Sequence, residues 1–341
     1  MKLYIILTIF LTLGAALSPF AVLLPDSDYK KPQTEITEES TENKNRIQAA
    51  EIIKVLRTGS GKVVEKELID YVKGAVSAEI SPEYEKEAIK AQAIVCYTYA
   101  LWLKKNADHA NLEDADISDD SGKYQGYLDD DELQEKWGDK YEQYSKKISE
   151  CVSEVIGKYL EYDGEPIMAC YHAISTGKTE SSKNVWGNDI PYLKSVTANG
   201  DLLSPDIDST VTLSKEQFKE CAEKLDGVKL SKNSSKWLGE IKTTESGYVL
   251  SLTIGSKNFS GNDIRNAFSL KSPAFTIEKT ENGFVFKVKG YGHLVGMSQY
   301  SADYMARQGS DWQEILKDYM ARKGATYDEI LLHFFKGANL K

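Results

Sequence analysis

The chain has 341 residues, of which 41% are hydrophobic and 28% charged, and its formal net charge is −10. These values are those of a globular protein with a sizeable core, in one large domain or two smaller ones. The acidic balance argues against nucleic acid as the main partner, because phosphate binding requires clustered Lys and Arg side chains. The 20 Tyr and 5 Trp residues suit stacking on sugars, although aromatic residues in an ordinary core are the commoner case.

The N-terminal segment 1–25 is strongly apolar, and residues 3–25 contain no charged side chain. A run of this length can span a bilayer. It can also be a cleaved signal peptide, with Ala16 or Ala21 near the cut. We favour a retained membrane anchor, because the apolar residues continue to Leu24. Both alternatives place the remaining chain outside the cytoplasm.

The next segment, 26–49, is polar, charged and poor in large apolar residues. It cannot bury enough surface to fold, so we expect a flexible linker. The folded domain is expected to cover residues 50–341. Its first element is a predicted β-hairpin, in which the apolar residues 52–56 and 63–64 flank a turn at 58–61.

A helix that ends in a carboxylate is predicted to follow this hairpin. Leu68, Val72, Ala75 and Glu79 are spaced four, three and four residues apart, so they share one helical face. Because the first three are apolar, Glu79 continues a stripe that faces the core. Loss of hydration there would raise the pKa of its carboxyl group, as a general acid near neutral pH requires. The alternative is the half-exposed Glu that commonly ends a helix.

A second helix is predicted to begin at Ser81-Pro82, where a capping hydroxyl precedes a proline at the first helical position. It should end near Lys105. Residues 106–131 are acidic and irregular, and they lack the ligand spacing of a calcium loop. We interpret them as a solvated surface insertion, followed by a helix over 137–156.

The cysteines and histidines give no recognisable metal motif. No CxxC pair, HExxH sequence or paired zinc spacing occurs. One or two disulfides are possible in an exported protein, and whether Cys151 pairs with Cys170 stays open. Cys96 lies in an apolar helical run, which indicates a small buried hydrophobe.

Two polar loops follow predicted strands. Residues 167–172 predict a strand that leads into the hydroxyl-rich loop 173–180, which lacks the GxxxxGK spacing of a phosphate-binding loop. His172 has a plain alternative as a structural histidine. The second loop, 290–299, has three glycines in seven residues, which indicates close backbone approach or positive φ. Such a loop can present its histidine, His293, to a ligand.

At this point three separated motifs match a known family. They are YVKGAVSAEISPEYEKEAIKAQAIVCYTYAL, YHAISTGKTESSKNVWG with PYLKSV, and GYGHLVGMSQYSADYMA. In this order, and with the closing ILLHFFKGANL, they resemble the stage II sporulation protein D family over roughly residues 50–341. The apolar N-terminus and the polar linker also fit this resemblance.

The resemblance implies a peptidoglycan lytic transglycosylase that acts during engulfment in sporulation. Such an enzyme cleaves peptide-stripped glycan strands after N-acetylmuramic acid and leaves 1,6-anhydro ends. The family's catalytic glutamate falls on Glu79, which would act first as acid and then as base, so no second carboxylate is demanded. The implied partners are the glycan, the sporulation amidase/endopeptidase P and membrane protein M. The implied location is the space between mother cell and forespore, on a membrane anchor and without a cofactor.

The family's substrate cleft resembles the two polar loops, whose hydroxyl groups, Lys178 and Gln299 would orient an N-acetyl sugar. The residues expected to bind substrate are Gln92, Tyr171, His172, Ser175, Thr176, Lys178, Thr179, Trp186, Tyr291, His293 and Gln299.

Three departures from the family pattern affect these expectations. Tyr97 stands where many members have Arg, so a contact of that Arg is changed or lost. Zinc-binding members carry a Cys and a His before a Gln-x-aromatic turn. The corresponding segment 118–127 has neither, so we expect no zinc there. Thr176 and Leu294 replace usual glycines, which should stiffen both loops slightly.

Three other functions remain as alternatives. One is a non-catalytic glycan-binding protein that enhances an amidase. Another is a muramidase-type hydrolase, with Glu83 as its second carboxylate. The last is a metal hydrolase built on Cys170, His172 and His293. For the fold we expect an α+β class with mostly antiparallel strands and packed helices, arranged as two lobes around a glycan cleft.

Overall fold

The computed structural model describes residues 51–107 and 109–321. Helices and mainly antiparallel sheets make up this part, which confirms the predicted α+β class; six of its eight strand pairings are antiparallel. The predicted anchor 1–25 and the whole of the predicted linker 26–49 lie outside the described residues. Within those residues, no helix has both the length and the apolar character needed to cross a bilayer.

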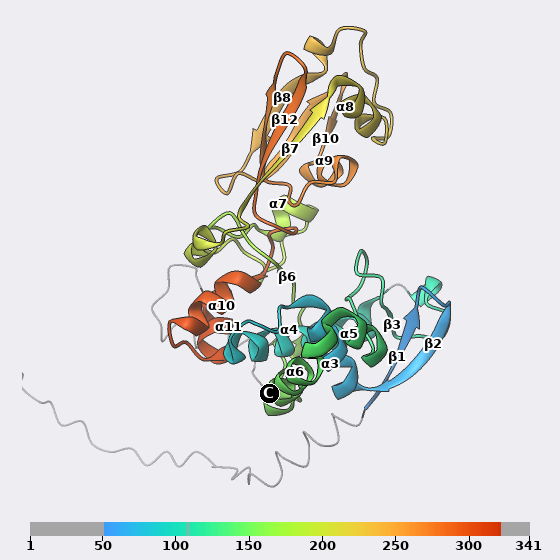
Figure 1. Cartoon of the computed structure of the whole chain (residues 1–341), viewed down its shortest axis with the longest axis vertical. Helices are drawn as coiled ribbons and strands as arrows, with labels where there is room; N and C mark the ends of the chain where they lie inside the picture. Colours follow the sequence, from blue (N-terminus) through green and yellow to red (C-terminus); the bar gives the residue numbers. More distant parts are fainter. Residues whose placement is uncertain (1–50, 108, 322–341) are drawn as a thin grey trace, which may run out of the picture. The chain divides into compact units, whose positions relative to one another are not determined.

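One group of elements surrounds a core of aliphatic residues and tyrosines (Figure 1). Helices α3, α4 and α6 pack on one another, and α10 and α11 pack on α4. Small residues such as Ala88 and Ala91, both fully buried, let the neighbours approach α4 closely. The elements are β1 (Ile52–Arg57), β2 (Lys62–Glu67), α3 (Leu68–Glu79), α4 (Lys86–Asn106), η1 (His109–Asn111), β3 (Ile117–Ser118), α5 (Asp130–Trp137), η2 (Gly138–Lys140), α6 (Tyr141–Val155), α10 (Gln299–Arg307) and α11 (Trp312–Ala321).

A second core is built from aromatic side chains between sheets and two helices. The Phe218 ring lies 4.1 Å from that of Phe284 and 4.9 Å from that of Phe268, measured between ring centroids. The sheets have the strand orders β11-β12-β7 and β10-β9-β8. The elements are β7 (Asp208–Ser214), α8 (Lys215–Ala222), η4 (Ser234–Lys236), β8 (Leu238–Thr243), β9 (Val249–Ile254), β10 (Lys257–Phe259), α9 (Gly261–Phe268), β11 (Phe275–Lys279) and β12 (Gly283–Lys289).

The two predicted polar loops are hydrogen-bonded to each other. Strand β6 (Tyr171–His172) pairs in parallel with β13 (Met297–Ser298). Tyr291 and Ile174 exchange both main-chain hydrogen bonds, at 2.7 and 3.1 Å. The remaining short elements in this region are β4 (Glu161–Tyr162), β5 (Glu165–Pro166), α7 (Ser182–Trp186) and η3 (Asn199–Leu203). The pairing brings segments about 120 residues apart in sequence into one unit.

The glycines of the second loop have the conformation that the sequence predicts. Gly290, Gly292 and Gly296 all have positive φ. A Cβ atom on Gly296 would lie 2.1 Å from the Cys170 carbonyl oxygen, so the strand pairing itself requires glycine. Leu294 also has a positive φ, of 70°, and its side chain is fully buried. Burial of this side chain offsets the strain of an unfavourable backbone conformation.

The hairpin 52–67 and the helix ending at Glu79 lie where predicted, but the start of the next helix was predicted wrongly. Ser81–Tyr84 forms a turn, and α4 begins only at Lys86. Lys147 explains the difference, because its Nζ donates to the carbonyls of Pro82 (2.9 Å) and Tyr84 (2.6 Å). These two carbonyls are held by a side chain of α6 and not by a helical ladder.

The prediction of a solvated insertion over 106–131 was also wrong. Leu112, Ile117 and Tyr127 are at most 6% exposed, and Ile117 pairs with β1. The segment reads as polar because the apolar residues are few and have many acidic neighbours. Several of these acids pair with cations on β1, as Asp119 does with Arg57. Part of the segment therefore belongs to the core, whereas residues 113–114 and 121–123 are exposed as predicted.

The sequence also predicts a hairpin over 275–288 about a two-residue turn at Asn282-Gly283. The hairpin exists, but the position of its turn was predicted wrongly. Residues 280–282 connect the strands, and Gly283 already pairs with Ser214 in β7. A Cβ atom on Gly283 would lie 1.9 Å from the Leu213 carbonyl oxygen, so this glycine serves close strand contact.

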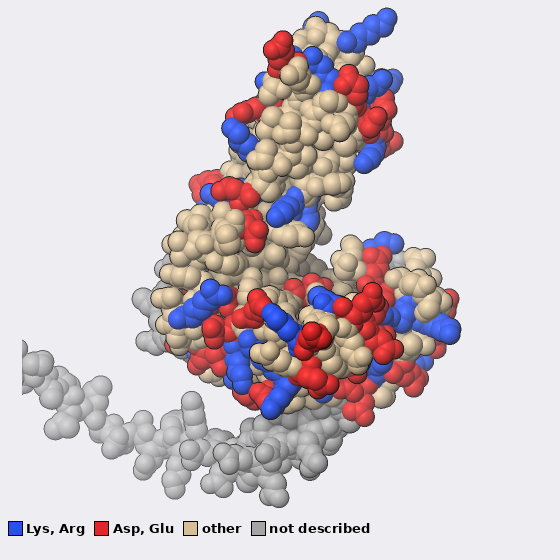
Figure 2. Space-filling view, viewed as in Figure 1, with Lys and Arg blue, Asp and Glu red and all other residues tan. Residues whose placement is uncertain are grey.

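The charges of the helical group alternate in sign on the face drawn in Figure 2, where Lys and Arg lie among Asp and Glu. Among the ion pairs of this group are Lys86 with Glu150 and Lys90 with Glu154. Such exposed pairs contribute little to stability, but they leave this face without a continuous basic surface.

Candidate active site

Glu79 ends α3 with its side chain half-buried. Leu68, Val72 and Ala75 are buried on the same helical face, which confirms the predicted stripe. The main-chain N–H of Gly126 donates to Glu79 Oε1 at 2.8 Å. Burial raises the pKa of the Glu79 carboxyl above its ordinary value, and the donors and the nearby Lys136 only partly offset this. A carboxyl group with a raised pKa is suited to donate a proton.

A chain of hydrogen bonds with a fixed direction ends at this carboxyl group. The Tyr71 hydroxyl donates to Gln125 Oε1 at 3.1 Å, and Gln125 Nε2 donates to the Tyr171 hydroxyl at 3.3 Å. The Tyr171 oxygen therefore accepts one bond and keeps its own proton for Glu79, with which it is hydrogen-bonded. Burial holds the pKa of Tyr171 well above its usual range, so the phenol stays a donor.

Two glycines allow this close approach. A Cβ atom on Gly126 would lie 2.6 Å from Glu79 Oε1. On α3 itself, a Cβ atom on Gly74 would lie 2.4 Å from the Tyr127 ring and 2.5 Å from the Leu128 carbonyl oxygen. The segment 125–128 can therefore dock on α3 only where side chains are absent.

The main-chain end of α3 is held by side chains from distant segments. Gln299 Nε2 donates to the Glu79 carbonyl at 3.0 Å and to Gln92 Oε1 at 3.3 Å. Lys136 Nζ donates to the Ser77 carbonyl at 3.0 Å. The last carbonyls of a helix lack intrahelical donors, so these contacts fix the position of the last residue. The structure thus brings together Glu79, Tyr171, Gln92 and Gln299 of the predicted site.

The predicted residues of the first loop have mainly internal partners. Ser175 and Thr179 are fully buried, and Thr176 Oγ1 donates to the Lys178 carbonyl at 3.2 Å. Lys178 Nζ lies 2.7 Å from Glu245 Oε2 in an exposed ion pair. Contact of these four residues with a substrate stays a prediction.

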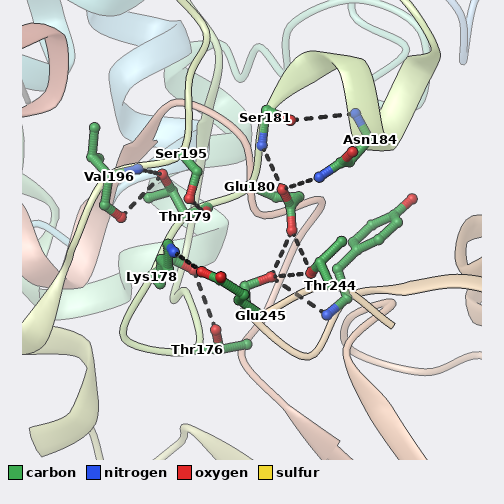
Figure 3. Close-up of polar contacts among 12 residues, drawn as sticks. Thr176, Lys178, Thr179, Glu180, Ser181, Asn184, Ser195, Val196, Thr244 and Glu245 are labelled. Atoms are coloured by element: carbon green, nitrogen blue, oxygen red, sulfur yellow. Dashed lines mark hydrogen bonds and ion pairs between the residues drawn. The ribbon is translucent and has the colours of Figure 1, made fainter. Parts of the chain in front are cut away.

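Glu180, at the end of this loop, is a buried carboxylate with four donors (Figure 3). Ser181 N–H and Asn184 Nδ2 donate to Oε1, both at 2.8 Å. Thr244 Oγ1 and Ser246 Oγ donate to Oε2 at 2.7 and 2.6 Å. Burial opposes ionisation, but the four donors outweigh it and lower the pKa of Glu180. Glu180 therefore joins the polar loop to the turn at 244–246.

His172, His293, Trp186 and Tyr291 form the aromatic part of the predicted site. His172 is 4% exposed, and its Nδ1 lies 3.0 Å from the Val295 carbonyl oxygen, so Nδ1 carries the proton. The His293 ring lies 6.0 Å from that of His172 and 5.5 Å from that of Trp186, between centroids. Burial lowers the pKa of His172 to about 4 and that of His293 to about 3, so both are neutral near pH 7. Trp186 and Tyr291 are exposed.

The alternative hydrolase function depends on Glu83, and the metal-hydrolase function depends on a group of metal ligands. Glu83 is exposed and accepts from Tyr144 at 2.6 Å and Lys140 at 3.2 Å, and these contacts lower its pKa. In the part of the chain that the structure describes, no three His, Cys, Asp or Glu side chains are grouped so that they could hold a metal ion. All four cysteines are free thiols, so Cys151 and Cys170 are not paired in this structure.

Sequence reasoning missed Gln125, Gly126, Lys136 and Glu180. The Gln-Gly-Tyr sequence at 125–127 was a signal for the first two, because glycine is the residue that lets the backbone approach a neighbour closely. Lys136 lies on the exposed side of α5, and no local pattern indicates its contact with α3.

Comparisons with known proteins agree with the motifs. A family model described as SpoIID, Stage II sporulation protein, matches residues 57–162. The chain is 33% identical over 311 residues to Stage II sporulation protein D of Bacillus subtilis, covering 88% of this chain and 89% of that protein. It is 35% identical to Stage II sporulation protein D of Bacillus amyloliquefaciens, over 78% and 76% of the two chains. An amidase enhancer of Bacillus subtilis is 26% identical over 72% of this chain, which spans 39% of that protein. The chain therefore belongs to the stage II sporulation protein D family.

Proposed function

We propose that this protein is a lytic transglycosylase that cleaves peptide-stripped glycan strands of peptidoglycan after N-acetylmuramic acid. The observation that carries the proposal is the state of the Glu79 carboxyl group. It is half-buried, its pKa is raised, and it is hydrogen-bonded to Gly126 and Tyr171. Membership of the sporulation protein D family supports a role in sporulation that concerns the cell wall. Engulfment is the stage at which we expect the activity.

In the first half of the reaction, Glu79 donates its proton to the glycosidic oxygen that links N-acetylmuramic acid to the next sugar. The bond between C1 and this oxygen breaks, and the departing sugar leaves with a free 4-hydroxyl group. Burial favours the protonated form of Glu79 that this step requires. The Gly126 N–H then stabilises the carboxylate that remains.

In the second half, the Glu79 carboxylate takes the proton of the 6-hydroxyl group on the same N-acetylmuramic acid. The oxygen attacks C1 and closes the 1,6-anhydro ring, which returns Glu79 to its protonated form. Tyr171 and Gly126 keep the carboxyl group in one orientation for both transfers. Because no water is the nucleophile, one carboxyl group suffices.

The N-terminal segment would anchor the enzyme on the outer side of a membrane, in the space between mother cell and forespore. There it would act beside amidase/endopeptidase P, which would supply peptide-stripped strands, and membrane protein M. These partners are part of the proposal and follow from the family resemblance.

The test is digestion of purified, peptide-free glycan strands by the full-length protein in mild detergent, with products identified by mass spectrometry. We expect fragments with 1,6-anhydro-N-acetylmuramic acid ends. Their rate of formation should fall by roughly 10²–10⁴-fold in Glu79→Gln, with Glu83→Gln as the matched control that retains activity. Reducing ends without the anhydro ring, or equal rates in Glu79→Gln, would refute the proposal.

The relative named amidase enhancer supports a second candidate, a glycan-binding protein that activates an amidase without cleaving glycan itself. This candidate predicts that the full-length protein binds glycan strands and leaves their length unchanged. It also predicts that Glu79→Gln stimulates an added amidase as well as the unchanged protein does. Glycan chain length, measured after incubation, separates the two functions.

A further inference from the structure

Arg265 differs from the other arginines in the described residues. Arg57 pairs with Asp119 and Glu132, and Arg307 pairs with Asp303. Arg265, on α9, is half-buried, and within residues 51–107 and 109–321 its main electrostatic neighbours are the phenols of Tyr291 and Tyr248, not a carboxylate. A half-buried guanidinium without an anion loses part of its hydration with no opposite charge to offset the loss, and this burial lowers its pKa. In a chain of net charge −10 such a cation indicates a place for an external anion.

A second cation lies beside the same aromatic residue. Lys271 Nζ is 5.4 Å from the centroid of the Tyr291 ring, which is 46% exposed. The Gly292 N–H donates to the Lys271 carbonyl at 3.0 Å, so the glycine loop is attached to the chain just after α9. The pKa of the His293 imidazole is lowered mainly by burial, then by His172 and then by the nearby charge of Arg265.

These residues adjoin the candidate active site through His293. Its ring is hydrogen-bonded to the main chain of Tyr171, the residue whose hydroxyl contacts Glu79. On its other side, the His293 ring lies 5.5 Å from that of Trp186, which is 40% exposed. An exposed Trp, an exposed Tyr and two cations are therefore neighbours of the loop 290–299, whose Gln299 holds the Glu79 carbonyl. Exposed aromatic rings can stack on sugars, and cations select acidic ones.

We infer that Arg265 and Lys271, with Trp186 and Tyr291, form a subsite that binds the free lactyl carboxylate of an N-acetylmuramic acid unit in the glycan strand. This inference rests on the proposed function and names the group that the strand must present. In peptide-bearing strands the lactyl carbonyl is an amide, which is neutral and leads into a peptide. In peptide-free strands it is a carboxylate, which an arginine can bind through two parallel N–H donors. Arg265 is thus a specificity residue for stripped strands.

The experiment measures binding in the full-length Glu79→Gln protein, so that cleavage cannot interfere. Two ligands are compared: peptide-free glycan strands, and the same strands after conversion of their carboxylates to N-methyl amides. We expect Arg265→Gln to weaken binding of the free strands by about tenfold or more, which is the usual effect of a charge-assisted hydrogen bond. Binding of the amidated strands should change less than twofold.

Three further variants complete the design. Lys271→Gln should cause a smaller loss with the same preference for free strands, and Arg265→Lys should restore part of the affinity. Lys279→Gln, an exposed cation at the end of β11, is the control and should change neither ligand. Equal losses on both ligands, or no loss in Arg265→Gln, would overturn the subsite.

The outcomes for the subsite and for the enzyme are separable. Carboxylate-dependent binding together with an absence of anhydro products in the unchanged protein would support the subsite and refute the transglycosylase. Anhydro products with equal affinity for free and amidated strands would refute the subsite alone.

Discussion

At the scale of single residues, Glu79 combines two opposing influences on one carboxyl group. Burial at the end of α3 favours the neutral form, whereas Gly126 N–H, the Tyr171 hydroxyl and Lys136 favour the charged form. Burial is the larger, so the pKa rises. The carboxyl group therefore remains able to give a proton and, once charged, already has its donors in place.

This balance predicts how stability depends on pH. The folded pKa of Glu79 lies above its ordinary value of 4.5, so the folded state binds the proton more tightly than the unfolded state. Stability should then fall as pH rises from 4.5 through the folded pKa, because stability decreases wherever the native state binds more protons. Glu79→Gln cannot ionise, so it should lack this fall in stability and be more stable than the unchanged protein at pH 8.

Urea unfolding at pH 4 and pH 8 measures the effect, with Glu83→Gln as an exposed control. The difference between the unchanged protein and Glu79→Gln should grow toward pH 8. A difference that is constant between the two pH values would contradict a raised pKa.

Tyr171→Phe tests the donor chain from Tyr71. The substitution removes a bond that lowers the pKa of Glu79, so the pKa should rise further. The alkaline limb of kcat/KM, which reports loss of the acid, should move to higher pH. We also expect a loss of roughly tenfold at the optimum, because Gln125 loses its acceptor.

The matched control is Tyr71→Phe, which removes the first bond of the chain and leaves the Glu79 contact intact. Its alkaline limb should move less than that of Tyr171→Phe. Unchanged limbs in both variants would show that the hydroxyl group does not affect the titration of Glu79.

At the scale of elements, the docking of segment 125–128 on α3 depends on Gly74. Alanine is favoured over glycine inside a helix by about 1 kcal/mol. Here its Cβ would lie 2.4 Å from the Tyr127 ring and 2.5 Å from a main-chain oxygen, and overpacking of this kind costs typically 1–3 kcal/mol. We expect the net effect of Gly74→Ala to be a destabilisation of up to about 2 kcal/mol and a lower activity, because Gly126 is displaced.

Lys73→Ala, on the adjacent position of α3, is the control for helix propensity and should be close to neutral. Thermal unfolding and the cleavage rate should be measured together. A stabilised Gly74→Ala protein with full activity would show that the segment can shift without loss of the site.

Whether an element could be predicted depends on how far apart in the sequence its interacting residues are. The apolar stripe of α3 and the strands of the first hairpin depend on local periodicity, so the sequence predicts them. The start of α4 depends on Lys147, some 65 residues away, and no local signal reveals it. The same limit applies to Gly126, whose partner is 47 residues distant in sequence. The place of Glu79 on a buried helical face was therefore predictable from the sequence, and most of its hydrogen-bond donors were not.

At the scale of the whole described part, Glu180 links segments that no local pattern relates. Four donors surround its buried carboxylate. In Glu180→Gln the amide N–H₂ group, which cannot accept, would replace one oxygen and leave its two donors without an acceptor. We expect a loss of roughly 2–4 kcal/mol in the free energy of unfolding. The pKa of Glu180 is lowered, so this contribution is present above its ordinary pKa and is lost as pH falls through the folded value.

Urea unfolding at pH 7 tests this prediction, and Glu245→Gln is the matched control because it removes an exposed partner of Lys178 in the same cluster. The control should change stability by less than about 0.5 kcal/mol. If both variants behave alike, the buried carboxylate does not hold the loop to the turn at 244–246.

The contact between Gln299 and the end of α3 has a consequence for the timing of folding. Its two ends are 220 residues apart in the chain, and closing so long a loop is slow relative to forming a helix. A polypeptide is made from its N-terminus, so Glu79 emerges early, Tyr171 follows near the middle of the 341 residues, and Gln299 arrives only in the last third. The nascent chain thus carries Glu79 long before Gln299 can hold the end of α3, so the candidate active site is complete only when synthesis is nearly finished.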